Sequence, residues 1–428
     1  MSSRPVSERA VIFLIGAVQF VNILDFVMVM PLGPDFAKGL GIDSSHIGYI
    51  AGSYTAAASV AGLVGGAFLD RFDRRKALAI SMLGLVLATA AGGLATGLSS
   101  LMLARVLAGL FGGPATSLAM SIVAELIPVE RRGRAMGAVM GAFSVASVVG
   151  VPLALYVAEL GGWRMPFFTV AALGLLVVLG AVFYLPPIRG HLEEGRRRDH
   201  PVGAAELLQN RDVQISYMMS ALVMMAGFIL IPNISAYVQQ NLHYPREFVG
   251  RIYFFGGIIS FITLRLAGPR VDKFGAFRVG TVGAVLSVIF TYIGFVNYPY
   301  WLPIPLLFMG YMMANGLRNV AYNTLTSRVP SNAVRARFMS LQSAVGHMAS
   351  AAGAFLSSKI LVDLPDGTLG GMGHVAMLSI LLTLMVPPML LVVERRIRAR
   401  DQAAAAQVVG VGPGGAVALA PSSSSSHH

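Results

Sequence analysis

The sequence predicts an all-α membrane protein of twelve transmembrane helices, arranged as two pseudo-symmetric six-helix bundles. The first observation is composition: 55% of the 428 residues are hydrophobic and 12% are charged, whereas soluble proteins carry about 25% charged residues. The second is that twelve apolar segments reach the length of about 20 residues that a helix needs to cross a bilayer. The third is a repeat, because the charged segment GAFLDRFDRRK at 66–76 returns in altered form as GPRVDKFGAFR at 268–278. A charged loop that recurs at about half the chain length indicates a duplicated helix bundle.

The predicted spans alternate with short polar loops, and the first of them is interpreted as a retained helix. Its apolar stretch contains Asp25 and no small-residue cleavage site, so it does not match a secretory signal peptide. Small residues at close spacing, such as Gly137 and Gly141, permit close approach between spans. The expected spans are 11–32, 47–69, 77–97, 101–123, 135–158 and 167–185, followed by 213–237, 248–267, 279–297, 302–323, 338–361 and 375–393.

A long polar stretch divides the chain into two sets of six spans. A second echo supports the duplication, since PVERRGRAM at 128–136 resembles PSNAVRARFM at 330–339. The expected organisation is an N-terminal bundle at 1–185, a cytoplasmic linker at 186–210, a C-terminal bundle at 211–400 and a disordered tail at 401–428, which ends like a tag remnant.

The distribution of lysine and arginine sets the expected orientation. Cytoplasmic loops carry an excess of these residues, and a cytoplasmic N-terminus places most of the 32 lysines and arginines on that side. The net charge of +12 is thereby explained without nucleic acid, which we do not expect as a partner. We expect a multi-pass protein of the inner (plasma) membrane with both termini cytoplasmic. It would act as a monomer in contact with membrane lipids.

Several classes of protein are excluded by what the sequence lacks. Without cysteine there are no disulfides, zinc fingers or thiol chemistry. The sequence contains no GxxxxGK[ST] phosphate loop, which argues against an ATP-driven pump. It also has no His/Glu cluster with metal-ligand spacing and no soluble segment long enough to hold a catalytic domain. We therefore expect no enzyme activity, no metal and no cofactor, and a small-molecule substrate that crosses the bilayer.

These motifs resemble the major facilitator superfamily, and in particular its drug/proton antiporter and sugar-efflux-like branch. The family pattern between helices 2 and 3 is G-x-x-x-D-R-x-G-R-R-K, and Asp73 here replaces its second Gly. The resemblance implies the major facilitator fold and transport by alternating access. The matching residues, expected to form a conformational latch between the two halves, are Gly66, Asp70, Arg71, Arg74, Arg75 and Lys76.

Two further motifs are similar to that family. Arg105 and Gly109 fit its R-x-x-x-G pattern in helix 4. In span 5, Gly150 and Pro152 are separated by one residue where the antiporter branch has Gly-Pro adjacent. The strict antiporter motif is therefore altered, while a helix with small residues and a bend at Pro152 is still expected.

The function of the charged loop at 66–76 can also be interpreted from its residues alone. Asp70 would lie at the end of span 2, where a carboxylate can face the positive N-terminus of a neighbouring helix or pair with the nearby arginines. Contacts that exist in one conformation and break in the other bias a two-state equilibrium. The alternative is a topology anchor that only follows the positive-inside rule.

Asp25 is an acidic residue well inside a predicted span, where an unpaired carboxylate is costly. At 1.5 Å per residue, the depths of Asp25 and Arg105 differ by roughly one helical turn, so the long arginine side chain can reach the acid. An acid that alternates between a proton and a cation is a simple proton-coupling device. The alternatives are a fixed structural ion pair, an Asp25 hydrated by the outer vestibule, and an Arg105 that extends to the interface.

Other polar side chains within the spans are candidates for the transport path. His347 lies near mid-depth of span 11 and can serve as a proton relay or as a hydrogen-bonded packing residue. Buried amides can line a polar path or bond between helices. The candidate amides are Gln19, Asn22, Asn315 and Asn319.

The main functional prediction is a secondary transporter that exports a small amphipathic or cationic solute in exchange for protons. Its substrate would lie near the midplane between the halves, in contact with helices 1, 4, 7 and 10. One alternative is a proton-independent uniporter or exchanger of sugars, lipids or metabolites. Another, of a different class, is a membrane sensor or scaffold that no longer transports.

Overall fold

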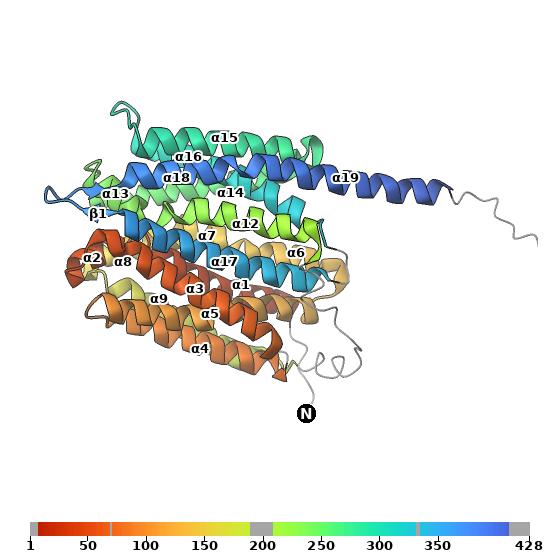
Figure 1. Cartoon of the computed structure of the whole chain (residues 1–428). Coiled ribbons are helices and arrows are strands. Elements are labelled where there is room, and N and C mark those ends of the chain that lie inside the picture. The colour runs from red at the N-terminus through yellow and green to blue at the C-terminus, as the bar shows by residue number, and fades with distance from the viewer. Residues whose placement is uncertain (1–6, 69–70, 189–208, 331–333, 411–428) are drawn as a thin grey trace, which may run out of the picture.

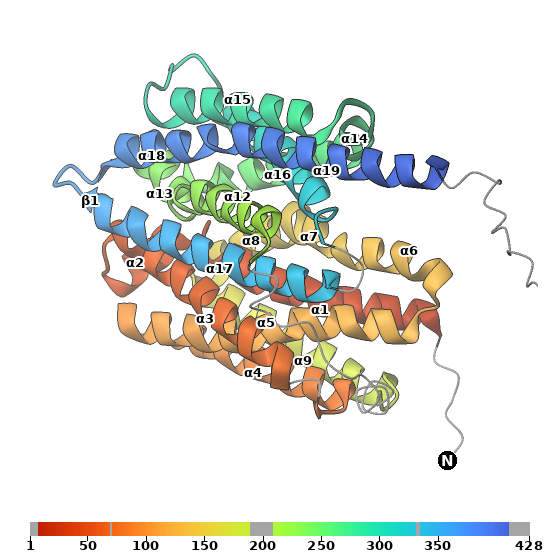
Figure 2. The same cartoon turned by 45° about the vertical axis from the view of Figure 1, so that its right-hand side comes forward.

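The computed structural model describes residues 7–68, 71–188, 209–330 and 334–410, and nearly all of them are helical. The long helices lie side by side along one axis, and in Figures 1 and 2 most helices of residues 7–188 (the N-terminal half) lie below most helices of residues 209–410 (the C-terminal half), whereas the helix of residues 335–360 lies among those of the N-terminal half. The N-terminal helices are α1 (Glu8–Met28), α2 (Gly33–Leu40), α3 (Ile47–Phe68), α4 (Arg74–Gly93), α5 (Leu98–Leu126), α6 (Val129–Met140), α7 (Ala142–Val145), α8 (Val151–Gly161) and α9 (Met165–Tyr184).

The C-terminal half repeats this arrangement of long helices. A two-stranded antiparallel hairpin, β1 (Val362–Asp363) with β2 (Leu369–Gly370), joins two of them. The helices are α12 (Arg211–Phe228), α13 (Ile234–Gln240), α14 (Val249–Phe274), α15 (Ala276–Phe295), α16 (Ile304–Thr326), α17 (Arg335–Ile360), α18 (Met372–Leu384) and α19 (Val386–Gly410).

Ten helical segments of the described chain are long and apolar enough to cross a membrane. The helices α16 and α17 have 23 and 26 residues and lie within the same bundle, but they are not among the ten. Polar side chains such as Arg318, Asn319, Gln342 and His347 lower their hydropathy. The all-helical membrane architecture is as predicted, whereas the count of twelve spans stays a prediction.

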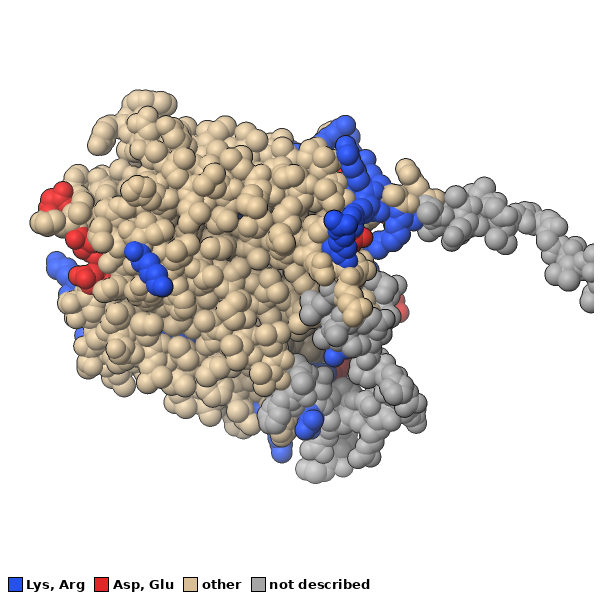
Figure 3. Space-filling view, in the orientation of Figure 1, with Lys and Arg blue, Asp and Glu red and all other residues tan. Residues whose placement is uncertain are grey.

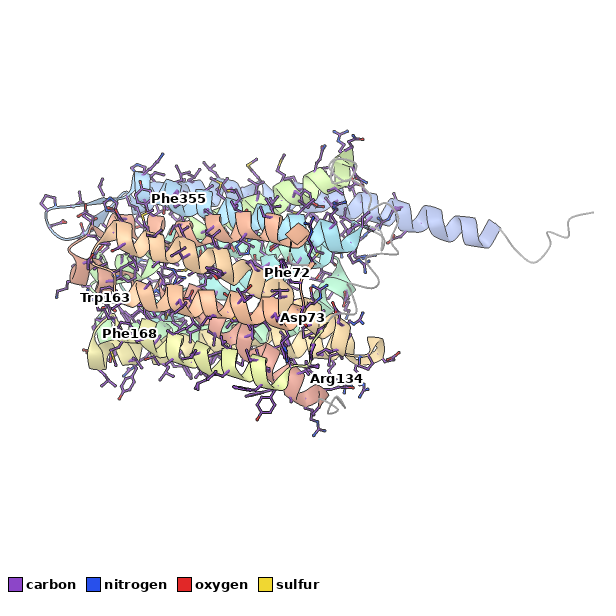
Figure 4. The ribbon with its side chains drawn as sticks, turned by 90° about the horizontal axis from the view of Figure 1, so that it is seen from below. Phe72, Asp73, Arg134, Trp163, Phe168 and Phe355 are labelled. Carbon is purple, nitrogen blue, oxygen red and sulfur yellow. The ribbon has the colours of Figure 1, made fainter. Side chains whose placement is uncertain are left out.

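Lysine and arginine gather at one end of the bundle, which we call the basic end (Figure 3). The first described residues of α1 and the free end of α19 are at this end (Figure 1). Asp73 and Arg134 also lie toward it, whereas Trp163 and Phe168 lie toward the other end, which we call the opposite end (Figure 4). The loops on the two sides of the bundle therefore differ in charge, as the positive-inside rule requires of a membrane protein.

Three predicted spans are interrupted, and each interruption contains a proline or lies shortly before one or two prolines. The segment 135–158 passes through a π-helical turn at Ala146–Gly150 before Pro152. The segment 213–237 is broken by the 3-10 turn Ile231–Asn233, which holds Pro232. α18 ends one residue before α19, whose first turn carries two prolines. Proline has no N–H to donate to the preceding turn, so helices break or bend where it occurs.

The two copies of the charged repeat differ in structure, contrary to the expectation of a loop in each half. In the second copy α14 continues through Pro269 to Phe274, and only Gly275 separates it from α15. Gly275 has φ of 90°, a left-handed conformation that glycine adopts without the steric cost of a side chain. The reversal is thus made in one residue. α19 likewise continues as a helix to Gly410, beyond the predicted boundary at Arg400.

Asp73, which departs from the family pattern, caps α4. Its Oδ1 accepts hydrogen bonds from the backbone N–H of Arg75 at 3.0 Å and of Ile188 at 3.3 Å. It therefore holds the start of α4 and the chain that leaves α9. Asp73→Ala should lower the free energy of unfolding by about 1 kcal/mol, the usual cost of losing a cap. Thermal unfolding in detergent measures this, and Asp73→Asn, which keeps an acceptor oxygen, should lose less; equal stability of Ala, Asn and wild type would contradict the role.

Candidate functional site

Asp25 of α1 and Arg105 of α5 form an ion pair inside the N-terminal half. Nη1 and Nη2 of Arg105 donate to Oδ1 and Oδ2 of Asp25 at 2.9 and 2.8 Å. The side chains are 0% and 1% exposed. Thr89 of α4 adds a hydrogen bond to Asp25 Oδ1 at 2.7 Å. A carboxylate and a guanidinium so deeply buried tolerate the loss of water only because they satisfy each other.

A second layer of contacts surrounds the pair. The guanidinium carbon of Arg105 lies 4.8 Å from the ring centre of Tyr54 on α3, within the range of a cation–π contact. The Tyr54 hydroxyl donates to Asn22 Oδ1 at 2.9 Å. Asn22 Nδ2 in turn donates to Thr116 Oγ1 at 2.6 Å and to a backbone carbonyl of α5. Four helices of the N-terminal half therefore contribute to one polar network around the ion pair.

A cavity of about 340 Å³ lies between the two halves. α1 and α3 of the N-terminal half and α12, α16 and α17 of the C-terminal half contribute to its wall. Its α17 residues belong to the part of that helix that begins at the basic end. Among the described lining residues are eight with hydrogen-bonding side chains: Thr55, Ser220, Tyr322, Asn323, Gln342, Ser343, His347 and Ser350.

Apart from Gly346, the rest of the wall consists of aromatic and thioether side chains, and one of them lies beside the ion pair. Phe26 lines the cavity and directly follows Asp25. Its ring centre is 5.9 Å from that of Phe228, across the interface between the halves, and 4.9 Å from that of Tyr54. Met224 and Met339 add thioether side chains to the apolar part of the wall. A solute in this cavity would thus be separated from Asp25 and Arg105 by Phe26 and Tyr54.

Described residues bridge the halves from mid-bundle to the opposite end. Arg246 donates to both carboxylate oxygens of Asp35 at 2.6–2.9 Å. The backbone N–H groups of Ser44 and Ser45 donate to the carboxylate of Asp363 at 3.2 and 2.9 Å. α3 packs along α17, where a Cβ on Gly48 would collide with the α17 backbone. The halves are closed at that end, with the cavity on the basic side of the closure.

Comparison with known proteins places the chain in a family. A model described as Major Facilitator Superfamily matches residues 15–354. The chain belongs to the major facilitator superfamily. Multidrug resistance protein 2 of Bacillus subtilis (strain 168) is 23% identical over 303 residues, which are 67% of this chain and 74% of the relative.

Solved structures of the superfamily have the same fold. A bacterial homolog of the human lysosomal transporter Spinster, in an inward-facing and unoccupied conformation, superimposes with a TM-score of 0.71 at 15% identity, covering 92% of this chain and 98% of that chain. A D-xylose–proton symporter superimposes with a TM-score of 0.69 at 18% identity, covering 89% and 97%. As a member of the superfamily this chain is a transporter and not an enzyme, which confirms the family and the class predicted from its sequence.

The other residues that the sequence predicted for the transport path lie at different places in the fold. His347 lines the cavity, apart from the ion pair. Gln19 and Asn319 are largely buried, and an amide oxygen of each has no partner among the described residues. Asn315 Oδ1 accepts from Arg318 at 2.7 Å. The cavity wall also differs from the predicted helix set, because α17 contributes more of it than any other helix and no described lining residue comes from α5, the fourth span.

Arg318 was not among the candidate residues predicted from the sequence. Like Arg105 of α5, it is a buried arginine within a long helix, here α16. It is 2% exposed and donates to Thr383 Oγ1 at 3.0 Å besides Asn315. No carboxylate pairs with it among the residues that the structure describes. Tyr54 and Thr89 were also missed. A tyrosine among small residues in span 2 is a weak signal, whereas a threonine within a span carries none.

The structure describes only part of the predicted conformational latch. Asp70 lies outside the described residues, and Gly66 is in the last turn of α3. Arg74 forms an ion pair with Glu125 of α5, and Arg75 Nη1 donates to the carbonyl of Leu185 at 3.2 Å. These contacts join parts of the N-terminal half. Arg71 and Lys76 are exposed at the basic end.

The predicted bend in span 5 takes the form of a π turn. Gly150 ends this turn and Pro152 lies in the first turn of α8. A Cβ at Gly150 would lie 2.8 Å from Leu24 Cδ1, so the glycine lets α1 approach. The same turn packs against α14, where a Cβ on Gly257 would lie 2.8 Å from Val148 Cγ2. The bend therefore shapes a contact between the two halves.

Filling the cavity should stop transport without unfolding the protein. A Cβ on Gly346 would lie 3.4 Å from Met224 Cγ, an ordinary contact, but the ring of Gly346→Phe would occupy the cavity. We expect transport by Gly346→Phe to fall roughly tenfold or more, since solute sites need most of their volume. Uptake into proteoliposomes measures this. Gly97→Phe, in a loop where a Cβ meets nothing within 4 Å, should keep wild-type uptake; equal uptake by both variants would place the solute elsewhere.

Proposed function

We propose that this chain is a secondary active transporter that exports a small amphipathic or cationic solute in exchange for protons by alternating access. The observation that carries the proposal is a mixed polar and aromatic cavity between the halves, next to the fully buried pair of Asp25 and Arg105. Closure at the opposite end leaves the cavity on the basic side. Solute would therefore enter from the side that we assign to the cytoplasm.

The wall of the cavity supports an amphipathic solute. Hydroxyl, amide and imidazole groups of α12, α16 and α17 can hydrogen-bond its polar part. Phe26 and Phe228 offer aromatic faces, which attract cations as well as apolar groups. The described lining residues include no carboxylate, so a cationic solute would rely on these faces. The name of the relative from Bacillus subtilis, a multidrug resistance protein, agrees with efflux of such compounds.

Coupling to protons would use the ion pair. Protonation of Asp25 removes the charge that holds Arg105, and the guanidinium then has only neutral hydrogen-bond acceptors, among them the backbone carbonyl of residue 25, and the Tyr54 ring. Because Phe26 and Tyr54 lie between the cavity and the pair, solute and proton can each favour a different arrangement of these rings. Exchange requires that binding of the solute disfavours binding of the proton, and the reverse. His347, within the cavity wall, is the second proton-accepting group that we propose.

The wider architecture that we propose follows from the sequence. Twelve spans would be divided at 186–210, with the protein in the inner membrane and both termini in the cytoplasm. The loop from Gly66 to Lys76 would act as a latch at the cytoplasmic side when the halves close there. Its contacts with α5 and the end of α9 support a fixed position on the N-terminal half.

The proposal is tested by transport into vesicles with and without an imposed pH gradient. Purified protein is reconstituted, and accumulation of a fluorescent cationic dye is followed. We expect the gradient to increase the initial rate and to have no effect on Asp25→Asn. If the gradient leaves the wild-type rate unchanged, proton exchange is wrong even though transport remains.

A proton-independent carrier of sugars is the second candidate. The hydroxyl, amide and imidazole groups of the cavity suit a hydroxyl-rich solute, and one structural neighbour is a D-xylose–proton symporter. In that case a pentose should compete with the dye, and an imposed pH gradient should change neither the wild-type rate nor the rate of Asp25→Asn. Failure of sugars to compete would exclude this candidate.

A further inference from the structure

A groove of about 520 Å³ lies between α14, α15 and α16, on the C-terminal half, and shares no lining residue with the central cavity. Its walls include Leu266, Phe274 and Val282, whose side chains are 49%, 47% and 55% exposed. Met313 and Leu317 of α16 form its floor. Large apolar side chains that remain exposed on the outside of a membrane bundle face lipid chains. The groove is therefore a largely apolar groove on the surface of the protein that faces the membrane.

Two arginines lie where this groove meets the basic end. Arg270 is near the end of α14 and Arg278 is in the first turn of α15, and both line the groove and are exposed. Arg270 Nη1 donates to the carbonyl of Leu266 at 2.9 Å, which turns its side chain back along the groove. Neither arginine has an ion pair among the described residues. Nearby, Lys273 adds a positive charge and Asp272 a negative one, so cations are in excess.

The sequence that supplies these arginines is the second copy of the charged repeat. In the first copy the arginines contact Glu125 and the end of α9. In the second copy α14 continues as a helix past Pro269, and the reversal at Gly275 places the first turn of α15 beside the last turns of α14. Arg270 and Arg278 therefore share one groove and are free to meet an external anion.

We propose that this groove binds one anionic phospholipid of the membrane leaflet at the basic end. The head-group phosphate would lie between Arg270 and Arg278, because guanidinium groups bind phosphate through paired, charge-assisted hydrogen bonds. One acyl chain would follow Leu266, Val282 and Met313. The volume of the groove falls within the range of about 300–1,000 Å³ that is usual for ligand sites. Basic pockets between transmembrane helices at a membrane surface suit anionic head groups.

The experiment titrates the purified full chain with phosphatidylglycerol and with phosphatidylcholine of the same acyl chains, and counts bound lipid by native mass spectrometry. Wild type should bind phosphatidylglycerol in preference. Each arginine near an anionic lipid surface strengthens binding about fivefold, so Arg270→Gln with Arg278→Gln should weaken it about thirtyfold. The charge-matched control is Arg335→Gln with Arg395→Gln, which removes two exposed arginines outside the groove, one at the start of α17 and one near the middle of α19. This control should bind as wild type does.

A second variant tests the acyl chain separately from the charge. Val282→Trp fills the groove from a side chain that is 55% exposed, so it leaves the core packing intact. It should weaken phosphatidylglycerol binding while both arginines remain. Soluble glycerophosphoglycerol, the head group alone, should bind far more weakly than the lipid. Equal binding of the two lipids, equal loss in the control variant, or full binding by the head group alone would each overturn the proposal.

Discussion

Neutralising either member of the Asp25–Arg105 pair should destabilise the protein strongly. Asp25→Asn leaves Arg105 buried at 1% exposure without its carboxylate, and Arg105→Gln leaves Asp25 without its cation. Breaking a buried pair in this way costs about 3–5 kcal/mol. The double variant removes both charges and should be more stable than the sum of the two single changes predicts. Thermal unfolding of the purified variants measures the coupling between the residues.

A matched pair at the surface provides the control. Asp212 and Arg396 are joined at 2.6 Å, but their side chains are 36% and 39% exposed. Exposed pairs of this kind contribute about 0–1 kcal/mol, so Asp212→Asn and Arg396→Gln should each have little effect. If Asp25→Asn were as stable as Asp212→Asn, the pair would not be the buried ion pair that the geometry describes.

The same variants separate a coupling device from a structural pair. A pair that only stabilises the fold should be dispensable once both charges are removed, and the double variant would then respond to a pH gradient as wild type does. A pair that exchanges protons cannot be replaced in this way. We therefore expect the double variant to recover stability without recovering the dependence of transport on the pH gradient.

The parts of this site that could be predicted are those that violate the apolar pattern of a span. Asp25 and Arg105 stand out because charge inside a span is costly, and the rise per residue of a helix gives their depths. Their contact required only that α1 and α5 be neighbours. The rotation of each helix about its own axis is not encoded in depth. For this reason the ring of Tyr54 and the hydroxyl of Thr89, which complete the site, could not be selected from the sequence.

The fold shows the same division. The helix positions follow from apolar segment length, and Pro152 indicated the bend in span 5. The form of each interruption did not follow, because a π turn at Ala146–Gly150 depends on how Gly150 packs against Leu24. For a related reason, the second copy of the charged repeat was wrongly predicted to form a loop. A sequence such as GPRVDKF is polar enough for a loop, but Pro269 lies within α14 because Gly275 can make the reversal alone.

Gly48→Val should trap the transporter away from the state described here. Gly48 lies in the first turn of α3, and a Cβ there would collide with the carbonyl of Ala354 and lie 2.5 Å from Ser358 Oγ on α17. Both contacts are between the halves, so each half can still fold. Overpacking costs on the order of 1–3 kcal/mol, which lowers the population of the closed opposite end roughly 5- to 150-fold relative to the other state. Because alternating access requires both states, solute uptake should fall by a similar factor.

The chain offers a direct readout of this shift because it contains no cysteine. Ser235 is 1% exposed at the closed end, where its hydroxyl donates to the carbonyl of Pro31 in the other half at 2.8 Å. A thiol introduced by Ser235→Cys should resist a membrane-impermeant maleimide in the wild-type background and react in the Gly48→Val background. Gly62→Val is the control on the same helix, because a Cβ there meets nothing within 4 Å. A protected thiol and normal uptake with Gly48→Val would show that the halves do not separate along α3 and α17, and alternating access would need another interface.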